Sequence, residues 1–218
     1  MCNIFIDPRA AVKVVPAPWS WLWPLLAMSV VVGVTTWLNA PLVIRIMQIN
    51  PPGNLTPGQV ERALPIIEMT QKISAFAVPI FIGLMTALSA GILSAACAVM
   101  DIRSTYRNNF ALLAQTLMFG ALQILAGYFV LRLKGDSVRT LGELRPAFGL
   151  DMLLADDASN LLRGLLSYFS IFNIWYILIL GLAFAYLTGT SKGKAYGATA
   201  PVWILGMLFS VVASLFQR

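Results

Sequence analysis

The polar side chains with the clearest chemical use surround one long apolar run, residues 165–187. The run contains one amide, Asn173, and the indole of Trp175, and a short basic turn follows it. An unpaired amide in hydrocarbon costs on the order of several kcal/mol, so we expect Asn173 to bond another span or a bound polar group. The two lysines of the turn would each contribute about 1 kcal/mol toward an anionic membrane surface. We therefore predict a candidate lipid or partner site formed by Asn173, Trp175, Ser191, Lys192, Gly193 and Lys194.

The same residues also have structural interpretations. Ser191 and Gly193 leave the turn open to a headgroup phosphate, but the lysines can equally serve only to fix the orientation of the chain in the membrane. Gln115 and Gln123 also carry side-chain amides, and they lie in another apolar run. These amides either form hydrogen bonds between helices or line a path for a substrate.

No constellation of residues typical of catalysis is present. The chain has no histidine, no glycine-rich phosphate loop, no CxxC pair and no G-x-S-x-G motif. Asp151, Asp156 and Asp157 offer a cation site as one alternative, whereas a solvated connection with Asp156 and Asp157 capping a helix is the other. We predict a protein that is not an enzyme, with no metal and no cofactor.

The composition indicates a membrane protein. Hydrophobic residues make up 59% of the 218 residues and charged residues only 11%, whereas soluble domains carry about 25% charged residues. The net charge is +6, but the lysines and arginines are scattered between apolar runs. This distribution favours contact with lipid headgroups and does not favour nucleic-acid binding.

Five charge-free windows are long enough to span a bilayer as helices. We predict an all-α polytopic membrane bundle, a single domain over residues 1–218 with short interfacial helices. Asp7 is expected to cap one of these helices at Pro8, and a second is expected to begin at Pro57 after Thr56 and to break at Pro65. The predicted spans cover residues 19–44, 73–100, 110–131, 165–187 and 198–216.

Small residues recur at every fourth position in the second predicted span, at Gly83, Ala87, Gly91 and Ala95. Such stripes let helix backbones approach closely. We predict that this stripe packs on a neighbouring helix, either within the chain or in a homo-oligomer, and that Gly91→Leu destabilises the protein.

Lysines and arginines in the shorter connections favour a cytoplasmic N-terminus. Two stretches also resemble a known family. The N-terminal IFIDPRAAVKVV with the following PW and WPLL, and the C-terminal YFSIFNIWYILILGLAFAYLTGTSKGKA, are similar to the opening and closing segments of the Yip family of Ypt/Rab-interacting membrane proteins, in its bacterial branch. The resemblance implies a role in membrane organisation or trafficking and a place in the bacterial cytoplasmic membrane. The DLYGP motif of the eukaryotic branch is absent, so a Rab-type GTPase is not expected as a partner.

Two functions follow from these observations. The first is a non-enzymatic integral membrane protein that organises membrane lipids or partner proteins. The alternative is a small oligomeric transporter, channel or lipid scramblase whose path is lined by Asn173, Gln115 and Gln123. The predicted spans contain no Asp, Glu, Lys or Arg, which disfavours a proton-coupled transporter.

Overall fold

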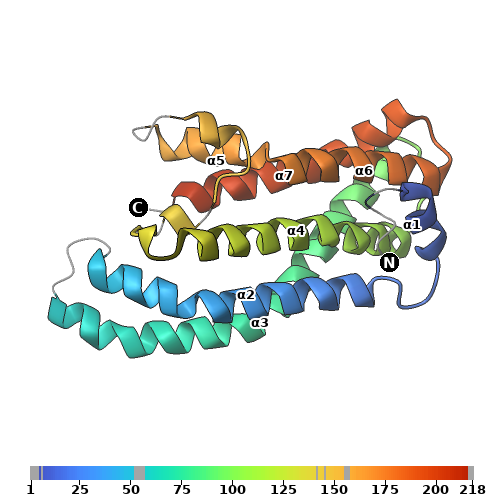
Figure 1. Ribbon diagram of the computed structural model, residues 1–218. Coiled ribbons are helices and arrows are strands. Elements are labelled where there is room, and N and C mark those ends of the chain that lie inside the picture. The colour runs from blue at the N-terminus through green and yellow to red at the C-terminus, as the bar shows by residue number, and fades with distance from the viewer. Residues whose placement is uncertain are drawn as a thin grey trace.

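The computed structural model describes residue 5 and residues 7–51, 57–140, 142–144, 146–154 and 158–215. Its elements are helical and follow one another along the chain (Figure 1). The α-helices are α1 (Pro8–Val14), α2 (Leu22–Ile49), α3 (Pro57–Val99), α4 (Tyr106–Lys134), α5 (Asn160–Tyr168), α6 (Ile171–Thr188) and α7 (Lys192–Leu215). Three short 3₁₀ turns, η2 (Gly135–Ser137), η3 (Gly142–Leu144) and η4 (Leu150–Leu153), lie between α4 and α5.

Within the described residues, five helices are long and apolar enough to cross a membrane. This finding confirms the predicted all-α polytopic fold. The boundaries differ from the predicted ones by several residues, because apolar runs also include helix ends and connections. The membrane-length segments are Leu22–Ile49, Phe76–Val99, Tyr106–Ser137, Ile171–Thr188 and Lys192–Val212.

The helix ends gather at two ends of the bundle (Figure 1). We call the end that holds α1, residues 100–105 and residues 189–191 the first end. The second end holds the C-terminal end of α4, the 3₁₀ turns and the C-terminal part of α7. The main hydrophobic core joins α3, α4, α6 and α7 and includes Leu93, Leu112, Leu180, Phe184 and Ala198.

The fourth predicted span is not one helix. The apolar run from residue 165 divides into α5 and α6, because Ser170 caps α6. The Ser170 hydroxyl accepts a hydrogen bond from the backbone N of Asn173 at 3.2 Å. Ile171 N donates to Phe148 O at 3.3 Å, and Ser170 forms an isolated β-bridge with Gly149. A Cβ atom at position 149 would lie 3.0 Å from the backbone of residues 166 and 169, so the connection docks closely against the break. We call residues 169–170 the helix break.

The predicted cap of that segment, Asp156 and Asp157, lies outside the described residues. The described cap is Ser159, whose hydroxyl accepts from Leu162 N at 3.3 Å.

The predicted short surface helix is also different, because it merges with the second span. α3 runs for 43 residues through Pro65 and Pro79. Each proline removes one backbone donor, but no glycine or asparagine stands between residues 59 and 82 to end the helix. The predicted capping residue Thr56 lies outside the described residues.

α1 begins as predicted, with Asp7 Oδ1 accepting a hydrogen bond from Arg9 N at 3.0 Å. The helix lies against α6 rather than away from the bundle, because the Arg9 guanidinium sits 4.7 Å from the centre of the Tyr186 ring. The hydrogen bond between Arg9 and the Tyr186 side chain, together with the electrostatic interaction of the two groups, raises the pKa of Arg9 above its usual value. Phe5, just before α1, packs its ring 4.8 Å from that of Phe119.

The small-residue stripe of α3 does not face a neighbouring helix along its whole length. Gly83 approaches Leu25 of α2, and Ala87 accepts a hydrogen bond from Tyr106. Gly91 and Ala95 are exposed, and a Cβ atom at Gly91 would meet nothing within 4 Å. The predicted packing within the chain is therefore wrong for these two residues, and packing in a homo-oligomer stays a prediction.

A different glycine holds two spans together. A Cβ atom on the buried Gly181 of α6 would lie 2.2 Å from Cε1 of Tyr196 in α7. Tyr196 lies there because its hydroxyl donates to Leu178 O at 2.9 Å. Stripes of small residues look alike in the sequence, and only the packing shows which stripe contacts another helix.

We expect Gly181→Ala to lower the melting temperature in detergent, because overpacking a close helix contact costs about 1–3 kcal/mol. Gly91→Ala is the matched control and should leave the melting temperature unchanged. Equal melting temperatures for the two variants would contradict the packing of α6 on α7.

The arrangement of the helices also predicts membrane topology. Residues 101–109 lie at the first end with α1, while α7 runs toward the second end (Figure 1). Reporter fusions in the 101–109 loop and at residue 218 should therefore report opposite sides of the membrane, with the loop on the cytoplasmic side. Fusions that report the same side would refute a five-span topology.

Candidate functional site

The predicted site residues fall into two groups at opposite ends of α6. Asn173 and Trp175 lie in its first turns, whereas Ser191, Lys192, Gly193 and Lys194 follow its C-terminal end. The 18 residues of α6 separate the groups by about 27 Å at 1.5 Å per residue. The prediction of one combined site is therefore wrong, because the amide begins the helix and the basic segment follows its end.

The basic segment is the start of a helix rather than an open turn. The chain reverses at Gly189, which has a φ of 67°, and Ser191 then accepts a hydrogen bond from Lys194 N at 3.4 Å. Lys194 Nζ donates to Asp101 O at 3.4 Å, so this lysine joins two connections at the first end. Lys192 and Gly193 are exposed.

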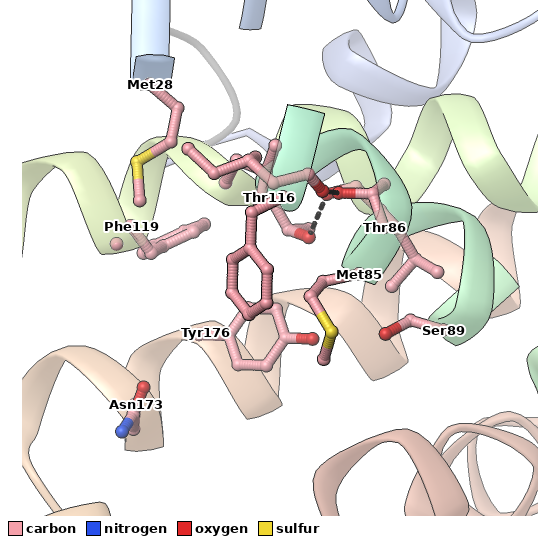
Figure 2. Close-up of a pocket in the computed structure, with 13 residues that line it drawn as sticks. Met28, Met85, Thr86, Ser89, Thr116, Phe119, Asn173 and Tyr176 are labelled. Atoms are coloured by element: carbon pink, nitrogen blue, oxygen red, sulfur yellow. Dashed lines mark hydrogen bonds between the residues drawn. The ribbon is translucent and has the colours of Figure 1, made fainter. Parts of the chain in front are cut away.

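Asn173 has a local partner. Its Nδ2 donates to Tyr168 O at 2.9 Å, a carbonyl group at the end of α5. The side-chain amide of Asn173 therefore pairs with a carbonyl group at the helix break and not with another span. The other alternative, a bound polar group as a partner, stays a prediction. The side-chain oxygen of Asn173 points toward the groove in Figure 2.

Trp175 belongs to an aromatic cluster. Its ring lies 5.3 Å from that of Phe119 and 5.7 Å from that of Phe5. The N-terminal and C-terminal stretches that carry the family resemblance therefore meet at this point in space, and the cluster closes the bundle on the α1 side.

An apolar groove of about 270 Å³ crosses the middle of the bundle, where α4 forms the floor between α3 and α6 (Figure 2). The hydroxyl groups of Thr86 and Thr116 donate to carbonyl oxygens of their own helices, at 2.8 and 2.7 Å. The groove consequently presents mainly hydrocarbon and thioether surface. Its lining residues include Met28, Phe81, Met85, Leu117, Phe119 and Tyr176.

A polar cavity of about 580 Å³ lies next to the groove, toward the second end. Ser210 Oγ donates to Gly164 O at 3.0 Å and lies 3.4 Å from Ser167 Oγ. The side-chain oxygen of Asn39 is buried without a hydrogen-bond partner among the described residues. The polar lining consists of Thr35, Asn39, Gln123, Tyr128, Asp151, Ser167, Tyr168, Asn173 and Ser210.

The described lining of the cavity combines neutral polar groups with one carboxylate. Burial raises the pKa of Tyr168, in α5 outside the five spans, to about 12, so its hydroxyl stays protonated at physiological pH. Asp151 supplies a carboxylate, and its Oδ1 accepts from Gly149 N at 3.1 Å. No cluster of metal-ligating residues occurs in the described part of the chain, and Asp156 and Asp157 lie outside that part.

The groove and the cavity share Gly120 and Asn173. A Cβ atom at Gly120 would lie 3.2 Å from Met28 Cε, so a larger side chain there would fill the space beside Met28 where the two hollows meet. We call the groove, this neck and the cavity the amphipathic site. Two glutamines were predicted to line a path. Gln123 lines the cavity, whereas Gln115 Nε2 donates to Ser20 O at 2.7 Å and so joins two parts of the chain.

Sequence reasoning missed most of this site. Gly120 is one of many glycines in apolar runs, and Phe148 lies in a connection whose docking depends on tertiary contacts. Asp151 appeared only as one member of an acidic segment. The signals that did point here were two of the predicted amides, Asn173 and Gln123.

Five membrane-length helices around an amphipathic cavity define a multi-pass helical membrane protein. The family model described as the Yip1 domain matches residues 3–214. The chain belongs to the Yip1 family, which confirms the resemblance of its two end segments. No curated protein and no solved structure matched the chain.

We predict that replacing Lys192 and Lys194 by Gln leaves the fold unchanged, because cations in the first turn of a helix oppose its dipole. The double variant should retain less anionic phospholipid in purified samples, because each lysine contributes about 1 kcal/mol to the binding free energy. Unchanged retention, or inverted orientation in the membrane, would show that these lysines only set topology.

Proposed function

We propose that this member of the Yip1 family is a non-enzymatic membrane protein that holds a membrane lipid in the amphipathic site and thereby organises lipid around itself. The observation that carries the proposal is that the apolar groove and the polar cavity share two lining residues, Gly120 and Asn173. We place the protein in the bacterial cytoplasmic membrane with a cytoplasmic N-terminus, as the sequence favours.

An acyl chain fits the groove because the groove lies between spans and is lined by Met, Leu and Phe side chains. Lipid tails are already in hydrocarbon, so moving one into the groove brings little hydrophobic gain. Selectivity must therefore come from the cavity, whose hydroxyl and amide groups bind the polar part of the molecule. A lipid is the amphiphile that the surroundings supply in excess.

The described hydroxyl groups support a binding role more than a catalytic one. Ser210 donates to a backbone carbonyl oxygen, and Ser167 donates to Gly164 O at 3.0 Å. Nucleophilic serines require an adjacent general base, and no described hydrogen bond joins either serine to Asp151, the carboxylate that lines the same cavity.

A lipid scramblase is the second candidate, because the polar cavity enters the bundle from the second end. Scrambling requires a polar path for the headgroup across the whole bilayer. Here the lining becomes mainly apolar beyond the neck, where the groove adds only Thr86, Ser89, Thr116 and Tyr176 as polar residues. Reconstitution in liposomes with a fluorescent phospholipid should show no accelerated movement between leaflets if the protein holds lipid, and accelerated movement if it is a scramblase.

The sharpest test of lipid binding is Gly120→Leu. The added side chain would fill the neck beside Met28, so we expect the purified protein to lose most of its co-purifying phospholipid, measured by mass spectrometry. Gly91→Leu, which adds the same side chain at an open surface, is the control. Both variants should be folded by circular dichroism.

Equal lipid content in the Gly120→Leu and Gly91→Leu proteins would contradict the proposed function. If Gly120→Leu does not fold, Gly120→Ala combined with Met28→Phe narrows the same neck with less added volume and serves the same comparison.

A further inference from the structure

We infer that the polar cavity binds the cationic ammonium headgroup of a zwitterionic phospholipid, with Asp151 as its counter-charge. The inference rests on the proposed function and names the class of lipid that the amphipathic site takes.

The charge distribution around the cavity carries the first step. Among the described residues that line it, Asp151 bears the only full charge at neutral pH. Two nearby arginines do not line the cavity and already have partners. Arg132 Nη2 donates to Leu38 O at 2.7 Å, and Arg45 forms a salt bridge with Asp136. The cavity therefore offers negative charge, and a bound cation would compensate it.

Aromatic side chains provide the second step. Tyr128, Phe148, Tyr168 and Phe209 line the same cavity as Asp151. Ring faces attract ammonium groups, most strongly where water is excluded. Arg132 already occupies the Tyr128 ring, since its Cζ lies 5.0 Å from the ring centre, which leaves Phe148, Tyr168 and Phe209 for a bound ammonium group. A carboxylate together with several rings is the combination that recognises ethanolamine and choline groups.

The neutral polar groups provide the third step. A zwitterionic headgroup also carries a phosphate, which requires hydrogen-bond donors. The Gln123 amide and the Tyr168 hydroxyl line the cavity as neutral donors. A headgroup with a net negative charge would find the same donors but would bring its charge close to Asp151, which is unfavourable in a medium of low dielectric constant. The cavity should therefore discriminate against anionic lipids.

Arg145 stands between Leu144 and Pro146, which both line the cavity, and it lies outside the described residues. An arginine that entered the cavity would favour an anionic headgroup instead. The test therefore includes the variant Arg145→Gln.

The experiment uses the full chain with Lys192→Gln and Lys194→Gln, so that lipid bound at the first end does not contribute. Native mass spectrometry in detergent then measures competition between phosphatidylethanolamine, phosphatidylcholine and phosphatidylglycerol. We expect both zwitterionic lipids to bind about tenfold more tightly than phosphatidylglycerol, the size of one desolvated cation contact.

Asp151→Asn should remove this preference while lipid binding itself persists, because asparagine keeps the acceptor for Gly149 N and the groove is unchanged. Asp101→Asn is the matched control. It makes the same chemical change at the first end, at a position whose φ of 50° suits asparagine, and it should keep the preference. Phe148→Leu should reduce the preference by removing a ring.

Three results would overturn the inference. These are a preference that survives Asp151→Asn, a preference for phosphatidylglycerol in the starting protein, and phosphatidylglycerol binding that Arg145→Gln abolishes. The failure of the proposed function would give a different result. The protein would then bind no lipid, or its lipid content would be the same with and without Gly120→Leu.

Discussion

The structure depends on the need to satisfy backbone polar groups at the helix break. In hydrocarbon an unpaired carbonyl or amide group costs several kcal/mol, so a span can be interrupted only where other groups replace the lost partners. Here Asn173 donates to Tyr168 O, Ser170 caps α6, and Phe148 O accepts from the chain just after the break. These bonds bring the connection before α5 against the bundle and place Asp151 beside the spans.

The two ends of the bundle differ in packing as a result. The first end is packed by buried amides such as Gln115 and by Tyr196 against Gly181. The aromatic cluster around Phe119 fills the bundle further along. The second end is held apart by the docked connection and by α5, which leaves a cavity among polar side chains. An apolar groove beside a hollow with polar side chains is suited to hold an amphiphile in one orientation.

Hydrophobic run length was enough to predict the all-α class and the five spans, because hydrocarbon thickness sets helix length directly. It did not predict the break at residues 169–170, since the local cap at Ser170 lies inside an apolar run and the docking of Gly149 and Phe148 against the break is a tertiary contact. Spacing showed that Gly91 belongs to a small-residue stripe but not that this part of the stripe is exposed. The distance between Asn173 and Lys192 could have been anticipated, because one residue begins a span and the other follows its end. The cavity could not, because Gly120, Phe148 and Asp151 come from segments whose docking no local pattern encodes.

The partners of the helix break have a consequence for biogenesis. All of the bonds described for it join residues between Phe148 and Asn173, and none requires α7. By the time Asn173 leaves the ribosome, every group that caps or bridges the break has already been synthesised. The segment can therefore enter the membrane already divided into α5 and α6, rather than as one long helix that must be broken later. The last span then arrives at a preformed surface, with Gly181 and Gly164 exposed to receive it.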